Sequence, residues 1–329
     1  MRQQMSTRHL AVELTAITDA AALASYCWLG MGRKKSGDKA AVDAMRRGFM
    51  EMDVDGIVVI GEGEKDEAPM LYNGERVGTG KGPRVDVAVD PVEGTRLLAL
   101  GRPNAIAVVA LAPRGTMFDP GPAFYMQKLV VPEQARGLVD INAPVGRTLA
   151  IVAEALGKKV RDLVVFVLEK DRHSRLIEDI RSAGARIQLH TDGDVAGAIM
   201  AVMPGTGVDL MLGTGGTPEA VLAAVAVRIL GGEMQGRLDP QSPEEAQAVS
   251  TAGLCTARVL RTEDLVGSDD ILFAATGITD GTFLSGVTRT EEGIRTCSLV
   301  MSGTSRTVRR IQSVYTPLRM SLLEAQACA

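Results

Sequence analysis

GIVVI at 56–60 followed by GEGEKDEAPMLY at 61–72, and VDVAV at 85–89 followed by DPVEGT at 90–95, are the stretches that decide how this chain folds. Both apolar runs are short and rich in β-branched residues, which is typical of buried strands. Each run ends directly in carboxylates and glycines. The sequence therefore predicts two strands whose ends deliver acidic loops, and two such ends can converge on one ligand.

The segments around these strands predict an α/β fold. Apolar residues recur at helical spacing over 36–52, and a further apolar strand is expected at 105–111. From residue 149 onward, expected helices and strands alternate, at 149–156, 163–168, 174–183, 186–189, 195–203, 208–212 and 218–230. Such alternation implies crossover units with ligand groups at the carboxyl ends of the strands. We expect a domain at 1–140 and a second α/β domain at 141–329.

Composition narrows the class of protein. The 329 residues are 46% hydrophobic and only 3% aromatic, which suits sheets covered by helices better than a β-sandwich. The net charge of −4 and the lack of a dense Lys/Arg run argue against nucleic acid or a membrane as partner. Glu13 and Asp19 interrupt the apolar stretch at 10–30, so we expect neither a membrane span nor a targeting signal, but a cytoplasmic protein.

The acidic strand ends have the chemistry of a divalent metal site. Mg²⁺ and Mn²⁺ prefer hard oxygen ligands, and the carboxylates of Glu62, Asp90 and Glu93 meet that requirement. The hydroxyl of Thr95 follows them and can orient a water molecule. Either string taken alone is also common turn chemistry. The cysteines and histidines are scattered without metal-ligand spacing, so we expect no zinc site.

These motifs resemble those of the class II fructose-1,6-bisphosphatases, within the lithium-sensitive phosphatase superfamily that includes inositol monophosphatases. The superfamily pattern Asp-Pro-x-Asp/Glu-Gly-Thr matches residues 90–95. The narrower class II pattern GEGE-x-DEAPMLY matches 61–72, and the Asp-Gly-Asp-Val and Gly-x-Pro-Glu segments match 192–195 and 216–219. The resemblance runs from about Leu10 to about Ser313, and it implies the lithium-sensitive sugar phosphatase fold with αβαβα layers.

The resemblance implies a catalytic centre that hydrolyses the 1-phosphate of fructose 1,6-bisphosphate with Mn²⁺ or Mg²⁺. Its metal ligands are Asp38, Glu62, Asp90, Glu93 and Glu219. Thr95 and Asp66 are expected beside the attacking water, and Lys34 beside the same phosphate. Without the family, helix capping or dipole compensation is the preferred explanation of Asp38 and Glu219.

The resemblance also implies a set of substrate contacts and a homo-oligomer, either a dimer or a tetramer. The contacts are Glu93, Gly94, Thr95, Tyr125, Lys170, Asp171, Arg172, Thr191, Asp192, Gly193 and Gly216. Lys170 and Arg172 follow an expected strand end, where paired cations can bind the second phosphate. From the residues alone, such a pair of basic residues is more often a solvated surface feature.

Three departures from the family pattern bear on these expectations. Lys170-Asp171-Arg172 stands where the family usually has Lys/Arg-Pro-Arg, so the loop loses a proline restraint and gains a negative charge. Two extra cations, Arg33 and Lys35, flank Lys34. The segment 232–262 is shorter than in some relatives, which bears on oligomer contacts.

Rival functions remain open at the level of sequence. Sedoheptulose 1,7-bisphosphate presents a similar furanose phosphate end, so it is an alternative or additional substrate. An inositol-phosphate phosphatase fits the generic metal motif but not the class II segments. A metal-dependent sugar-phosphate sensor needs the binding residues without the water-activating ones, and the presence of Asp66 and Thr95 argues against it.

Overall fold

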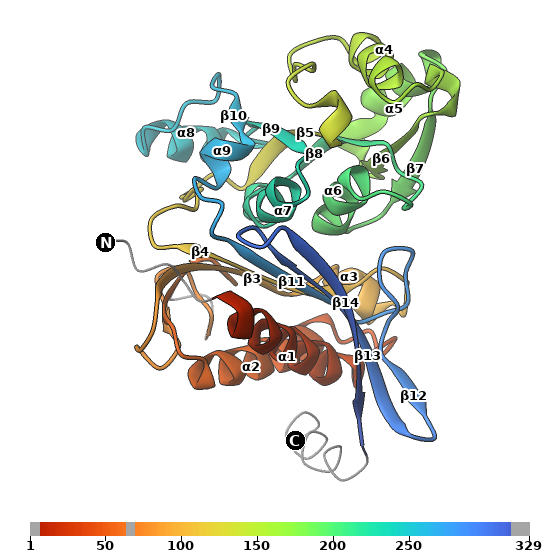
Figure 1. Cartoon of the computed structure of the whole chain (residues 1–329). Coiled ribbons are helices and arrows are strands. Elements are labelled where there is room, and N and C mark those ends of the chain that lie inside the picture. Colours follow the sequence, from red (N-terminus) through yellow and green to blue (C-terminus); the bar gives the residue numbers. More distant parts are fainter. Residues whose placement is uncertain (1–6, 64–69, 317–329) are drawn as a thin grey trace. The chain divides into compact units, whose positions relative to one another are not determined.

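The computed structural model describes residues 7–63 and 70–316, and its contacts divide the chain into two compact units (Figure 1). Unit 1 comprises Met1–Met117 and Ser268–Ala329, and unit 2 comprises Phe118–Gly267. This division differs from the single boundary expected near residue 140. The reason is that a strand after residue 268 returns to pair with a strand that ends at Pro113, so both ends of the chain build unit 1.

Unit 1 is a mixed sheet in the order β12-β13-β11-β4-β3-β1-β2, with β14 also paired to β13. The strands are β1 (Asp55–Ile60), β2 (Arg76–Val77), β3 (Arg84–Glu93), β4 (Ile106–Pro113), β11 (Leu272–Gly277), β12 (Thr288–Thr290), β13 (Gly293–Ser302) and β14 (Thr307–Tyr315). The helices are α1 (Thr7–Tyr26), α2 (Lys34–Glu51) and α3 (Thr95–Ala99). Helices α1 and α2 pack side by side against the sheet and bury one core with it.

Unit 2 is a second mixed sheet in the order β10-β9-β5-β8-β6-β7, where β6 lies parallel to β7 and β8. Its strands are β5 (Tyr125–Val131), β6 (Val164–Leu168), β7 (Arg186–His190), β8 (Leu210–Gly216), β9 (Glu233–Leu238) and β10 (Leu260–Arg261). Its helices are α4 (Val145–Ala155), α5 (Ser174–Ser182), α6 (Asp194–Val202), α7 (Thr217–Ile229), α8 (Pro243–Thr251) and α9 (Thr262–Leu265), with short 3₁₀ turns at Glu133–Ala135, Val160–Asp162 and Asp171–His173.

Strand β6 shows how the sequence places helices on both faces of this sheet. Val165 and Val167 pack in the core that α4 and α5 share, whereas Phe166 points to the opposite face. There it packs against α6 at Gly197, where an added Cβ would lie 2.3 Å from the Phe166 ring. Because β6 is buried on both faces, its sequence is a continuous apolar run. The predicted α/β class is confirmed.

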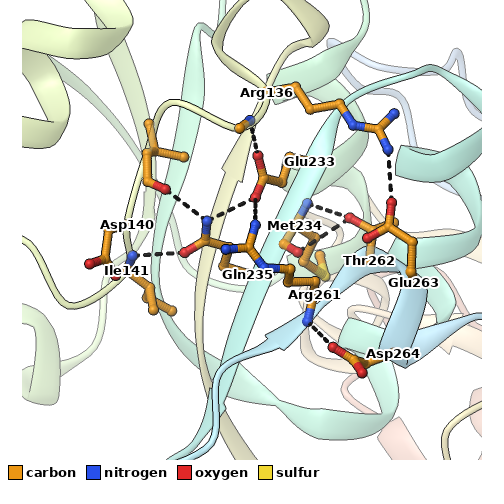
Figure 2. A network of polar contacts seen from close by, with 12 residues as sticks. Arg136, Asp140, Ile141, Glu233, Met234, Gln235, Arg261, Thr262, Glu263 and Asp264 are labelled. Carbon is orange, nitrogen blue, oxygen red and sulfur yellow. Dashed lines mark hydrogen bonds and ion pairs between the residues drawn. The ribbon is translucent and has the colours of Figure 1, made fainter.

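A buried polar network fastens the segment 137–141 to β9 (Figure 2). Glu233 accepts hydrogen bonds from the Gly137 amide, from Gln235 Nε2 at 2.8 Å and from Arg261 Nη1 at 3.1 Å. Gln235 accepts a further bond from the Ile141 amide at 2.8 Å. Glu233 and Gln235 are 4% and 1% exposed, so these bonds supply the partners that buried polar groups need.

A second buried network attaches α1 to the sheet of unit 1. Asp19 is 1% exposed and accepts hydrogen bonds from Ser298 Oγ at 2.6 Å, Thr276 Oγ1 at 3.1 Å and the Tyr315 hydroxyl at 2.8 Å. These partners lie on β13, β11 and β14. Asp19, one of the two acidic residues that interrupt the apolar stretch at 10–30, is therefore the polar anchor of the first helix.

We predict that Asp19→Ala lowers the free energy of unfolding by about 3 kcal/mol, because two buried hydroxyl groups and the partly buried Tyr315 hydroxyl lose a charged acceptor at once. Ser298→Ala removes one donor and should cost only about 1 kcal/mol. Equilibrium urea unfolding followed by circular dichroism measures both. If Asp19→Ala were no more destabilising than Ser298→Ala, the anchor role would be wrong.

Candidate active site

Strands β1 and β3 bring two acidic segments to the same edge of the unit 1 sheet. They pair in parallel, with Ile60 opposite Ala88, so both run toward the same edge. Glu62 lies two residues beyond Ile60, and Asp90 lies two residues beyond Ala88. Strand β3 then shifts its register against β4 between Asp90 and Glu93, where the side chain of Glu93 is buried. The predicted convergence of two strand ends is therefore present in the backbone.

Gly94 turns the chain from β3 into α3 and places Thr95 at the first position of that helix. Gly94 has a φ of 90°, in the left-handed region that glycine tolerates. An added Cβ would lie 2.9 Å from Leu97 Cδ1. The Gly94 carbonyl accepts the amide hydrogens of Leu97 and Leu98 at 2.8 and 3.2 Å. Thr95 is half-buried and lies two residues after Glu93 in the chain.

The base of the first acidic loop is closed by backbone hydrogen bonds. The Glu62 amide donates to the Leu71 carbonyl at 2.9 Å, and the Asn73 amide donates to the Gly63 carbonyl at 3.0 Å. At Gly61 an added Cβ would lie 1.9 Å from the Leu71 oxygen, so only glycine fits there. Asp66, the predicted proton acceptor, lies at 64–69, outside the described residues.

Leu71 adopts a left-handed backbone conformation, with a φ of 55°, although it is a fully buried leucine. Such a conformation costs about 1–2 kcal/mol for a residue other than glycine, so the surroundings must hold it in place. The buried carboxylate of Glu75 accepts the Leu71 amide hydrogen and also binds Arg46 Nε at 2.7 Å. No sequence motif marks Arg46 and Glu75, because the two residues are separated by 29 positions in the chain.

Helix α2 carries two further predicted site residues on one face, Lys34 and, one turn later, Asp38. Burial raises the pKa of Asp38, and the Lys34 ammonium opposes that rise. Asp38 is the fifth residue of α2, beyond the capping positions, so capping does not explain it. The flanking cations Arg33 and Lys35 are exposed.

The carboxylates of unit 1 fit a divalent metal by chemistry, since Glu62, Asp90 and Glu93 are hard oxygen donors on adjacent strand ends. Within residues 7–63 and 70–316, however, no three His, Cys, Asp or Glu side chains gather closely enough to hold an ion. The described residues thus bring the acidic strand ends to one sheet edge, but they do not by themselves close a coordination sphere. Glu219 belongs to unit 2.

Unit 2 gathers most of the predicted substrate contacts at the ends of β5, β6 and β7. The guanidinium of Arg172 lies 5.1 Å from the centre of the Tyr125 ring, and its Nε donates to the Thr214 carbonyl at 2.9 Å. Lys170 Nζ forms an ion pair with Asp192 Oδ1 at 2.8 Å. The structure therefore joins the 170–172 loop, Tyr125 and the 191–193 loop into one cluster.

His173, which the sequence analysis did not single out, holds the 170–172 loop in place. Its Nδ1 lies 2.7 Å from the Leu168 carbonyl, and its Nε2 lies 2.7 Å from the Thr214 amide. Nε2 must accept from that amide, so Nδ1 carries the proton and the ring is neutral. Burial lowers the pKa of His173 and thus favours the same form. Asp171 is exposed in the 3₁₀ turn that occupies the place of the family's proline.

The remaining predicted residues lie where α6 and α7 begin. Thr191 and Asp192 follow β7. Gly193 has a φ of 109° and precedes Asp194, the first residue of α6. Asp194 is buried and pairs with the buried ammonium of Lys128, another pair that the sequence analysis missed. A charge within the apolar strand 125–131 was the available signal, because a buried lysine requires a partner.

Two consecutive glycines leave space for the carboxylates of this region. A Cβ added at Gly215 would lie 1.8 Å from an Asp194 oxygen, and one added at Gly216 would lie 1.8 Å from a Glu219 oxygen. Glu219 is only partly exposed, in the first turn of α7, and burial raises its pKa. The nearby Lys128 opposes that rise and Asp194 adds to it. Because Glu219 lies in the first turn of α7, compensation of the helix dipole is an alternative role for it.

No helix of the described residues is long and apolar enough to cross a membrane.

Comparison with known proteins identifies the family. The family model described as "Bacterial fructose-1,6-bisphosphatase, glpX-encoded" matches residues 8–315. The chain is 44% identical over 321 residues to fructose-1,6-bisphosphatase 1 class 2 of Escherichia coli K12. This alignment covers 94% of this chain and 95% of the relative. The class 2 enzymes of Escherichia coli O6:H1 and Shigella flexneri match to the same extent. The chain therefore belongs to the class II, glpX-encoded fructose-1,6-bisphosphatases, a family of metal-dependent phosphoric monoester hydrolases that act on a sugar bisphosphate.

Proposed function

We propose that this chain hydrolyses fructose 1,6-bisphosphate at the 1-position, by direct attack of water on a phosphate bound beside the β1–β3 edge of unit 1. The observation that carries this proposal is the parallel register of β1 and β3. It brings Glu62 and Asp90 to one sheet edge, within a chain whose family acts on this class of substrate.

Asp38, Glu62, Asp90 and Glu93 are the proposed ligands of Mg²⁺ or Mn²⁺ in unit 1. The bound ions supply Lewis acidity, which lowers the pKa of water and stabilises charge on phosphoryl oxygens. The donor chemistry supports this assignment, whereas the expectation that Glu219 is a ligand rests on the family resemblance.

The residues of unit 1 divide the remaining work at the scissile phosphate. Thr95 orients the attacking water through its hydroxyl, and its fixed place directly after Gly94, at the start of α3, supports that role. Lys34 neutralises charge that develops on the phosphoryl oxygens. Asp66 accepts the proton of the water, an assignment that follows from the resemblance alone.

The cluster in unit 2 binds the second phosphate and the sugar. Lys170 and Arg172 supply positive charge, and each is already held by a neighbour, Lys170 by Asp192 and Arg172 by Thr214. Restrained cations lose less side-chain entropy when they bind an anion. Tyr125, Asp171, Thr191, Asp192, Gly193 and Gly216 complete the proposed set in unit 2.

A phosphate-release assay with fructose 1,6-bisphosphate, sedoheptulose 1,7-bisphosphate and inositol 1-phosphate tests this function. We predict turnover of the fructose substrate with Mg²⁺ or Mn²⁺, no turnover after exhaustive chelation, and inhibition by Li⁺, since the ligands are hard carboxylates. Full activity after chelation would contradict the metal-dependent mechanism. Faster turnover of another member of the panel would reassign the substrate.

Thr95→Val should lower kcat by at least about 10²-fold, because the variant keeps the shape of the side chain but cannot orient the water. Thr95→Ser should retain a measurable fraction of activity. Steady-state kinetics, with metal occupancy confirmed by calorimetry, measures the effect. A Val variant with near-normal kcat would remove Thr95 from the mechanism.

Arg172→Ala should raise KM at least about tenfold and change kcat little, because a contact to the far phosphate contributes equally in the ground and transition states. Arg175→Ala is the matched control. The Arg175 side chain is 94% exposed, and its substitution removes the same charge three residues away. A large loss of kcat at unchanged KM would exclude a pure binding role for Arg172.

A further inference from the structure

Glu75 joins two elements of unit 1 that carry proposed metal ligands. The residue is 6% exposed and lies just before β2. Its Oε1 accepts a hydrogen bond from Arg46 Nε of helix α2 at 2.7 Å, and its Oε2 accepts the amide hydrogen of Leu71. Each carboxylate oxygen thus has a different partner, one on a helix and one on the acidic loop.

The contact to Leu71 continues directly to Glu62. The Leu71 carbonyl accepts the Glu62 amide hydrogen at 2.9 Å, and Gly61 packs so closely against that carbonyl that a Cβ would lie 1.9 Å from it. Leu71 makes both contacts in a left-handed backbone conformation, with a φ of 55°. Loss of the Glu75 acceptor therefore frees Leu71 to relax, and any relaxation moves the carbonyl that holds Glu62.

The contact to Arg46 reaches the helix that carries Asp38. Arg46 lies eight residues after Asp38 on α2, which packs against β3 and α3. Its side chain is 38% exposed, whereas that of Glu75 is 7% exposed. A partly desolvated ion pair adds little net stability on average, but its hydrogen-bond geometry fixes the positions of the groups it joins.

We propose that Arg46 and Glu75 form a positioning pair that sets the placement of Glu62 relative to Asp38, and through it the affinity of unit 1 for divalent cations. Neither residue touches metal or substrate. The inference rests on the proposed function, in which Glu62 and Asp38 are metal ligands. Because Arg46 and Glu75 act on the metal ligands alone in this proposal, they should affect turnover only by changing how much of the chain has metal bound.

The test compares Arg46→Met with Arg47→Met in the full-length chain. Arg47 is the next residue on α2 and is exposed, so the two variants lose the same charge from the same helix. Isothermal titration calorimetry with Mn²⁺ should show affinity at least about tenfold weaker for Arg46→Met and within about twofold of wild type for Arg47→Met. Glu75→Gln should behave like Arg46→Met, because an amide cannot accept at both oxygen positions.

Kinetics at increasing Mn²⁺ provides the readout that a merely structural role would not change. For Arg46→Met, kcat should fall at low Mn²⁺ and recover as Mn²⁺ is raised, with the KM for fructose 1,6-bisphosphate little changed. If Arg46→Met does not fold, Arg46→Lys keeps the charge but loses the guanidinium geometry, and it should show the same shift in Mn²⁺ dependence.

Three outcomes separate the possible errors. Mn²⁺ affinity equal to wild type in folded Arg46→Met and Glu75→Gln overturns the positioning role. Equal weakening in Arg47→Met shows that helix charge alone is responsible, and it also overturns the proposal. A wild-type chain that neither binds Mn²⁺ nor hydrolyses the bisphosphate refutes the proposed function instead.

Discussion

The parallel pairing of β1 with β3 is the constraint on which the proposed chemistry depends. With Ile60 opposite Ala88, the two strands deliver Glu62 and Asp90 to one edge of the unit 1 sheet. Side chains alternate between the two faces along a strand. A shift of β3 by one residue against β1 would therefore turn the side chains of β3 to the opposite face of the sheet. The core that α1 and α2 share with the sheet holds that register, since it buries both strands.

Around this edge, the chain combines strained backbone with buried polar contacts. Leu71 is left-handed and buried, and its amide and carbonyl are both used, by Glu75 and Glu62. In unit 2, the neutral His173 likewise contacts two backbone groups, the Leu168 carbonyl and the Thr214 amide. In both places, a buried polar side chain fixes a loop that carries proposed functional residues, and it does so through backbone groups. Such contacts preorganise a site before any ligand binds.

The sequence predicts the local elements well, because periodicity and β-branched runs are local signals. The helix expected at 36–52 and the strands expected at 56–60 and 85–89 correspond to α2, β1 and β3. The division into units was not predictable in this way, since β11 pairs with β4 across more than 150 residues. The Asp19 anchor and the His173 bridge were missed for the same reason. Whether a polar side chain is buried depends on partners that are distant in the chain.

The central claim is that carboxylates at the β1–β3 edge hold the divalent cation. Anomalous diffraction at the manganese edge, from crystals of the chain grown with Mn²⁺, tests it most directly. The account predicts an anomalous peak in contact with carboxylate oxygens of Glu62, Asp90 and Glu93. Mn²⁺ bound elsewhere, with these three side chains making no contact to it, would contradict the account.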